Sequence, residues 1–170
     1  MERRKELKEK EVRLASLFEE YYDRIARYAF TRIGDRGDAE DLASDVFVKA
    51  LKALDSFEER GLPMGAWLFK IAHNLVVDYH RRNSQRRITD IEKIDIEAGG
   101  DLAMEVETRL EMERVTQAME ILTEDQREII RLRFYGGLSS AEVGAMLGKS
   151  DGAVREAQST ALKKLRIKLT

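Results

Sequence analysis

The sequence contains no cysteine, one proline, one tryptophan and few aromatic residues overall. Because it has no thiol, the chain cannot form a disulfide, a thiolate metal site or a cysteine nucleophile. The shortage of proline and the abundance of Glu, Lys, Arg, Leu and Ala favour helices, so we expect an all-α fold. No apolar run is long enough to span a membrane, and the charged N-terminus does not resemble a signal peptide. We therefore predict a cytoplasmic protein without membrane insertion.

Charge is distributed unevenly behind a net value of −2. Residues 1–87 carry a net +2, residues 88–113 carry −7 and residues 114–170 carry +3. Helical periodicity also dissolves in the acidic middle, which suggests a segment without a core of its own. We predict two small helical domains and a flexible acidic linker, with bounds at 1–87, 88–104 and 105–170.

Three segments of the first domain carry apolar residues at helical spacing. The first runs to Ile33, before Gly34, and its Glu/Lys/Arg-rich beginning is expected to fray. Asp38 is predicted to cap the second helix, and Pro63 is tolerated in the first turn of the third. Three such amphipathic helices can bury a shared core.

The second domain has the proportions of a helix-turn-helix. Sequences shaped like capping boxes head two of its helices, at Thr123 and Ser139. Gly148 then forms a tight turn before Ser150, which can cap the last helix. That helix presents residue types that contact phosphates and base edges, namely Arg155, Glu156, Ser159 and Lys163. An ordinary helical hairpin with a solvated face is the alternative.

Three stretches resemble the extracytoplasmic-function (ECF) sigma factors of the sigma-70 family. Asp-Ala-Glu-Asp-Leu at 38–42, followed by Asp45 and Phe47, is similar to the family's core-binding helix. The stretch from Trp67 to Arg82 is similar to its next helix, and residues 122–165 are similar to its −35-reading domain. The resemblance implies a factor that binds core RNA polymerase and directs transcription initiation at promoter DNA, reading the −10 element with the first domain.

The resemblance also assigns a role to three carboxylates on one side of their helix, Asp38, Asp41 and Asp45. It implies that they contact the clamp helices of the polymerase's largest subunit. A solvated helix face, with charges that complement the helix dipole, is the alternative.

For the −10 element, the resemblance implies a polar stripe on the third helix, made of Lys70, Asn74, Asp78, Arg81 and Arg82. It also implies that the loop Ser56–Met64 holds a base extruded from the stack. Arg86 and Arg87 extend the two arginines into a basic cluster that could bind the DNA backbone or only solubilise the helix end. Trp67 stands at a core-facing position and is expected to be structural.

For the −35 element, the implied contacts are Arg155, Glu156, Ser159, Lys163 and Lys164. The acidic linker could mimic nucleic acid within the polymerase, or it could serve as a simple tether. By the same resemblance, an anti-sigma factor is a further expected partner.

No enzymatic activity is expected. His73 and His80 are separated by about 10 Å along one helix, too far to share a metal ion, and both are expected at the surface. The carboxylates form no hydrolytic set and no phosphate-binding glycine loop occurs, so we predict no catalytic residue, no metal and no cofactor. A metal-dependent enzyme and a helix-turn-helix regulator that does not direct polymerase are the alternative hypotheses.

Overall fold

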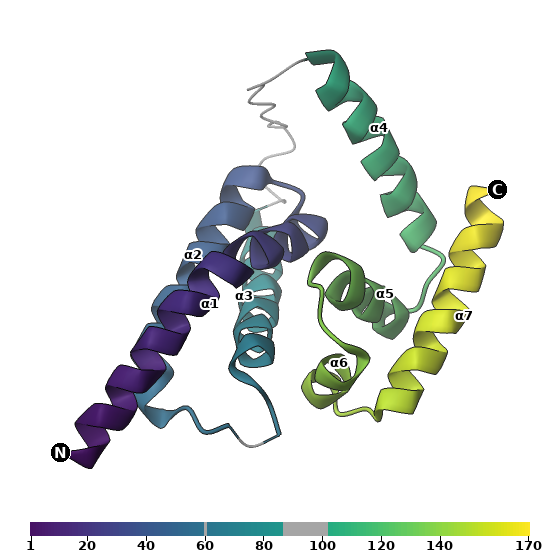
Figure 1. Ribbon diagram of the computed structural model, residues 1–170. Helices are drawn as coiled ribbons and strands as arrows, with labels where there is room; N and C mark the ends of the chain where they lie inside the picture. Colours follow the sequence, from purple (N-terminus) through teal and green to yellow (C-terminus); the bar gives the residue numbers. More distant parts are fainter. Residues whose placement is uncertain (60, 87–101) are drawn as a thin grey trace.

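The computed structural model describes residues 1–59, 61–86 and 102–170, and these residues form helices and turns (Figure 1). The predicted all-α fold is confirmed. Most of the predicted linker, 88–104, lies outside the described residues, as does Arg87 of the predicted basic cluster. The elements are α1 (Glu2–Ile33), α2 (Arg36–Ala53), the 3-10 turn η1 (Leu54–Ser56), α3 (Met64–Arg86), α4 (Leu102–Met119), α5 (Glu124–Ile130), the π-helical turn η2 (Arg131–Tyr135), α6 (Ser140–Leu147) and α7 (Asp151–Leu169).

The end of α1 lies where the sequence predicts it, but its beginning and the cap of α2 do not. The expectation that its first residues fray is wrong, because the helix begins at Glu2. It ends where predicted, at Gly34, whose φ of 80° is the left-handed conformation that glycine adopts without strain. Asp35, rather than Asp38, caps α2: its side chain accepts a hydrogen bond from the backbone N–H of Asp38, 2.8 Å away. The cap therefore forms directly after the glycine, three residues before the predicted position.

The second half contains the predicted helix-turn-helix, α6 and α7. Both capping boxes are present, with Thr123 heading α5 and Ser139 heading α6. Gly148 is left-handed, with φ of 67°, and Ser150 caps α7 as predicted. Gly144 lies against the turn between the two helices, since a Cβ there would stand 2.5 Å from the carbonyl oxygen of Lys149.

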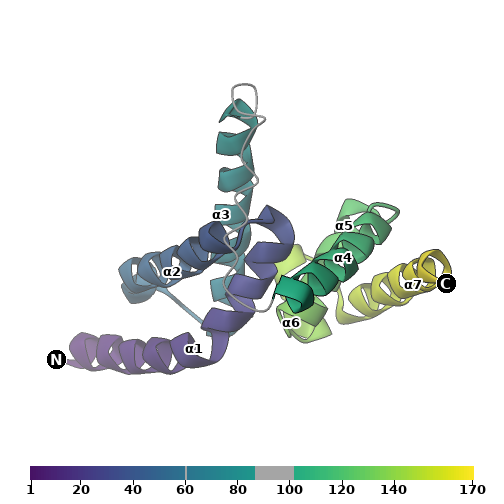
Figure 2. The same ribbon diagram turned by 90° about the horizontal axis from the view of Figure 1, so that it is seen from above.

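The two halves of the chain pack against each other and share one hydrophobic core. The turn η2 packs on α1 and α6 packs on α3, and Figure 2 shows α6 next to α1. Gly136 makes this approach possible, because a Cβ at that position would come within 3.0 Å of the Phe69 ring. Its carbonyl accepts a 2.7 Å hydrogen bond from the Arg24 Nε. Gly136 is thus one point of contact between the halves.

A second, smaller core lies within the C-terminal half, where α4, α5 and α7 meet. It is formed by Met119, Leu122, Ile130 and Ala161, with Val115 and Leu165 packed at its edge. Ala161 follows Val154, which packs in the larger core, by two helical turns, so both cores contact the same face of α7. Among the described residues, no helix is long and apolar enough to cross a bilayer.

Candidate nucleic-acid and protein interfaces

The outward face of α2 carries both acidic and apolar side chains. Asp41 and Asp45 are exposed, while Leu42 and Val46 on the opposite side are buried in the core. Helical spacing therefore aims both carboxylates at solvent, as predicted. Val48 lies one turn beyond Asp45 on the same side and is also exposed.

Asp38 differs from these two carboxylates because it has an intramolecular partner. It accepts a 2.7 Å hydrogen bond from the Tyr79 hydroxyl of α3. Partial burial and this hydrogen bond to Asp38 raise the pKa of Tyr79 to about 12. Asp38 thus ties the first turn of α2 to α3, while Asp41 and Asp45 keep their charges available.

The polar stripe of α3 is present, with one internal ion pair. Lys70 and Asn74 are exposed, and so is Arg82 at the far end of the helix. Asp78 Oδ1 lies 2.6 Å from Arg81 Nη2, so these two predicted DNA contacts neutralise each other in the free protein. Nucleic acid would have to compete for Arg81 with this neighbouring carboxylate.

The loop between η1 and α3 is attached to the core by one aromatic side chain. Phe57 is buried, and its ring centroid lies 4.5 Å from that of Trp67. Trp67 is half-buried beneath this contact, which agrees with a structural role. Of the remaining described loop residues, Glu58, Glu59, Gly61 and Pro63 are exposed.

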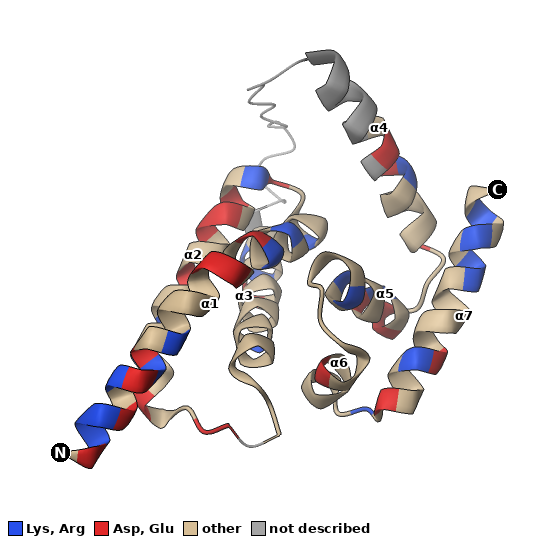
Figure 3. Cartoon of the chain, viewed as in Figure 1, with Lys and Arg blue, Asp and Glu red and all other residues tan. Residues whose placement is uncertain are grey.

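A shallow groove lies along α7. It is lined by Arg133, Arg155, Gln158, Ser159, Leu162, Lys163 and Arg166. Three predicted −35 contacts, Arg155, Ser159 and Lys163, are exposed along it. Glu156 is exposed but is not part of the groove lining. Figure 3 shows blue basic residues towards the C-terminal end of α7.

Lys164 does not join the groove. It is half-buried, and its Nζ donates a 3.1 Å hydrogen bond to Gln126 Oε1 at the start of α5. The one-residue step from Lys163 rotates the side chain by about 100° around the helix, away from the groove and towards the helix-turn-helix scaffold.

Arg155 is held before any DNA arrives. Its guanidinium forms an ion pair with Asp151 one turn earlier, and Asp151 also accepts a hydrogen bond from the Ser140 hydroxyl of α6. These hydrogen bonds, first that from Arg155, hold the pKa of Asp151 below its ordinary value. The arrangement fixes the direction of Arg155 and links it to α6.

Sequence reasoning missed three residues of these surfaces. Arg133 extends from η2 into the groove, where it donates hydrogen bonds to Gln158 Oε1 at 2.8 Å and to the Leu138 carbonyl at 2.7 Å. Only the tertiary structure could reveal it. Arg166, in contrast, follows Lys163 by three positions, and Val48 follows Asp45 by three, so helical spacing was the signal that could have found both.

His73 corrects the expectation of a surface position. It is half-buried, and its Nδ1 lies 3.3 Å from Glu128 Oε1 of the other half of the chain. Glu128 also accepts a hydrogen bond from the buried Tyr28 hydroxyl. Burial by itself would raise the pKa of Glu128, but the hydrogen bond with His73, the Arg32 charge and the hydrogen bond from Tyr28 together lower it. Within the described part of the chain, no group of carboxylates and histidines is arranged to hold a metal ion.

Two family models match the chain in separate segments. The model described as Sigma-70 region 2 matches residues 17–86, and that described as Sigma-70, region 4 matches residues 118–166. The first contains α2, α3 and the loop between them. The second contains the helix-turn-helix and its groove.

Two relatives are similar to this chain over both of these segments. The ECF RNA polymerase sigma factor BldN of Streptomyces coelicolor is 35% identical over 151 residues, which are 88% of this chain and 57% of that protein. The chain thus spans little more than half the length of that relative. The ECF RNA polymerase sigma factor SigD of Mycobacterium tuberculosis is also 35% identical over 151 residues, 84% of this chain and 70% of that protein.

Solved structures agree over nearly the whole chain. CnrH, in complex with the cytosolic domain of CnrY, superposes with a TM-score of 0.66 and 28% identity, covering 92% of this chain and 86% of that one. The sigma factor RpoE of Bartonella quintana, in complex with the anti-sigma factor NepR, superposes with a TM-score of 0.65 and 26% identity, covering 91% and 95%.

Proposed function

Because the chain belongs to the ECF sigma factors of the sigma-70 family, we propose that it binds core RNA polymerase and directs the enzyme to specific promoters. The observation that supports this most directly is the presence of both family regions, in order, on one chain. A regulator that only binds DNA would need the helix-turn-helix but not the α2 face or the α3 stripe. The proposed role is one of binding, in the cytoplasm, and needs no catalytic residue and no cofactor.

The polymerase would dock on the outward face of α2. Asp41 and Asp45 supply negative charge there, and the exposed Val48 supplies an apolar contact. A surface that combines complementary charge with an apolar centre is typical of specific protein interfaces. Asp38 contributes by holding α2 against α3 through Tyr79, rather than by a free charge.

Promoter DNA would contact two separate surfaces. The α3 stripe, with Lys70, Asn74, Asp78, Arg81 and Arg82, would bind the −10 element, assisted by the loop before α3. The α7 groove would bind the −35 element through Arg155, Ser159 and Lys163, with Glu156 at its edge, and Arg133 and Arg166 as added phosphate contacts. We place Lys164 in the scaffold, because it donates to Gln126. The functional division remains 1–87, 88–104 and 105–170.

An anti-sigma protein is the proposed regulator. RpoE, which covers nearly all of this chain at 26% identity, was solved bound to such a protein. For this chain the partner would have to cover the exposed α2 face, since that surface is needed for polymerase binding. Core polymerase and the partner would then compete for the same residues.

The test is reconstitution with purified bacterial core polymerase. Wild-type protein should form a stable holoenzyme and start transcription at discrete sites on genomic DNA. Replacing both Asp41 and Asp45 by Arg should weaken core binding by more than about tenfold, because two attractive contacts become repulsive. The matched control replaces Glu19 and Asp23, exposed carboxylates of α1, by Arg and should leave core binding intact. Duplex DNA binding without any core binding would contradict the proposal.

A further inference from the structure

The first turns of α1 lie outside the segment that the family model matches, which begins at residue 17. They are nevertheless helical from Glu2 and lie beside η1, where the loop to α3 begins (Figure 1). In this part of α1, basic and acidic residues alternate (Figure 3). Neither the polymerase-binding face nor the promoter-binding surfaces account for this extension.

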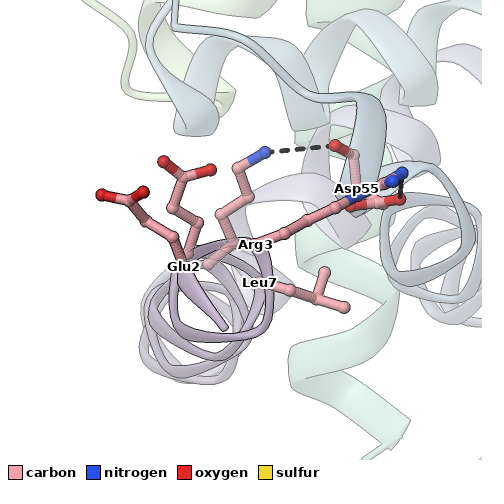
Figure 4. A pocket seen from close by; sticks show the side chains of 6 residues that line it. Glu2, Arg3, Leu7 and Asp55 are labelled. Atoms are coloured by element: carbon pink, nitrogen blue, oxygen red, sulfur yellow. Dashed lines mark hydrogen bonds and ion pairs between the residues drawn. The ribbon is translucent and has the colours of Figure 1, made fainter.

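Three basic side chains of the extension reach this region: Arg3 and Lys10 bind Asp55 of η1, and Arg13 binds Glu59 of the loop that follows. Arg3 Nη2 lies 3.1 Å from Asp55 Oδ2, and Lys10 Nζ donates a 3.3 Å hydrogen bond to the Asp55 carbonyl. Arg13 donates two hydrogen bonds to the Glu59 carboxylate, from Nη2 to Oε1 at 2.9 Å and from Nη1 to Oε2 at 3.4 Å. Figure 4 shows Arg3 and Leu7 projecting from α1 beside Asp55.

Helical spacing explains why these side chains meet the loop together. Arg3, Leu7 and Lys10 recur at intervals of four and three, which places them on one side of α1. Leu7 packs at the edge of the hydrophobic core, and Leu14, two helical turns further on, is buried in it. The two leucines pack the extension against the core, and the basic residues near them reach η1 and the loop.

The described ends of the loop and Glu59 in its middle are held by different groups. Its ends are secured by buried side chains, Leu54 and Phe57 on one side and Met64 on the other. Glu59 is exposed between them, so its contact with Arg13 comes from outside the loop. The hydrogen bond from Arg13 holds the pKa of Glu59 below its ordinary value. The middle of the loop is therefore positioned by α1 rather than by a core beneath it.

We propose that Arg3, Lys10 and Arg13 are positioning residues that hold residues 55–59, from η1 into the first part of the loop, in the conformation that recognises the −10 element. The inference rests on the proposed function, which places an extruded base at this loop. A base leaves the stack readily only if its pocket already exists, because ordering the loop during binding would reduce affinity. Exposed ion pairs add little to global stability, so their effect should appear in loop order and in promoter selection.

Loop order can be measured in the full-length protein through its single tryptophan. Trp67 lies under the loop, against Phe57, so acrylamide quenching of its fluorescence reports how well the loop is packed. Arg13→Gln should increase quenching at an unchanged melting temperature, and Arg13→Lys should fall between wild type and Arg13→Gln, because lysine keeps the charge but loses the two-point grip. The matched control is Arg4→Gln, which removes an exposed charge beside Arg3. Acrylamide should quench its Trp67 fluorescence as much as in wild type.

Promoter selection tests the consequence. Holoenzyme made with Streptomyces coelicolor core polymerase is incubated with DNA duplexes that contain a randomised stretch of sequence. The bound DNA is then recovered and sequenced. Wild type should enrich a −10 motif, and Arg13→Gln should lower that enrichment about three- to tenfold with core affinity unchanged. Arg4→Gln should not lower it.

The outcomes separate the two proposals. If wild type enriches no −10 motif, the proposed function fails and this inference falls with it. If wild type enriches a motif and Arg13→Gln enriches it equally, only the positioning role is overturned. An equal loss with Arg4→Gln also overturns it, because bulk charge, rather than the grip on Glu59, would then be the cause.

Discussion

Arg32 of α1 and Glu128 of α5 are 96 positions apart in the chain, yet Nη1 and Oε2 lie 3.0 Å from each other. Both side chains are largely buried, at 13% and 8% exposed. Tyr28 and His73 also contact the same carboxylate, and Arg131 lies 3.9 Å from it. One acidic side chain of the C-terminal half is thus surrounded by polar groups of both halves, and its charge is compensated where water is scarce.

Breaking this pair should be costly. Arg32→Ala leaves a buried carboxylate without its nearest cation, and the loss should be about 3 kcal/mol of unfolding free energy. Urea denaturation of the full chain measures it. The matched control, Arg36→Ala, removes an exposed ion pair with Glu40 and should cost less than about 0.5 kcal/mol. Equal effects of the two variants would show that the buried pair contributes nothing particular.

Acid should weaken the contact between the halves. The pKa of Glu128 lies below its ordinary 4.5 in the folded protein, so near that pH the unfolded chain binds more protons than the native one. Its stabilising contribution is therefore complete above about pH 4.5 and is lost as the pH falls through the lowered, folded-state pKa. Urea denaturation between about pH 3 and 6 should show this loss in wild type. The side chain of Glu128→Gln cannot titrate in this range, so its free energy of unfolding should depend less on pH. An identical pH dependence in the two proteins would exclude Glu128 as the cause.

Two glycines of the helix-turn-helix should respond in opposite directions to alanine. Gly144→Ala places a Cβ 2.5 Å from the Lys149 carbonyl oxygen, and the forced shift between α6 and α7 should cost about 1–3 kcal/mol. A Cβ at Gly152 meets nothing within 4 Å, so Gly152→Ala should stabilise α7 by about 0.5–1 kcal/mol. Thermal unfolding distinguishes them. A neutral Gly144→Ala would show that the turn is looser than the structure indicates.

Two adjacent lysines of α7 should contribute differently to DNA binding. Lys163 lines the groove, and Lys163→Gln should weaken binding of duplexes of any sequence and reduce the slope of log affinity against log salt by about one. Lys164 donates to Gln126, and Lys164→Gln should change that slope much less. Fluorescence anisotropy over a salt series, with a duplex from a mapped promoter, checks both. Equal slopes would place Lys164 at the phosphate backbone after all.

Local features were predictable because they depend on neighbouring residues. Capping boxes at Thr123 and Ser139, the turn at Gly148 and the exposed carboxylates Asp41 and Asp45 all follow from helical spacing and turn chemistry. The two family segments could be recognised for the same reason, since each motif lies within a short, continuous stretch. The cap at Asp35 was misplaced by three residues, because a second aspartate stood nearby at a plausible position.

Relationships between distant segments could not be predicted. Periodicity shows that Tyr79 lies on a half-buried face, but not that its hydroxyl reaches Asp38. It shows that the first turns of α1 are charged, but not that Arg13 meets Glu59. His73 looked like a surface residue because its partner, Glu128, belongs to the other half of the chain.

The sequence by itself determined the helices, most of their caps and turns, the family and the faces that we propose for polymerase and promoter binding, since each depends on a few consecutive residues. The tertiary structure decided which charges remain available on those faces. It also decided how the halves join at Gly136 and which segment contacts the loop before α3. The physical reason is that burial and ion pairing depend on three-dimensional proximity. The groups that bury a side chain or pair with its charge can come from distant parts of the sequence.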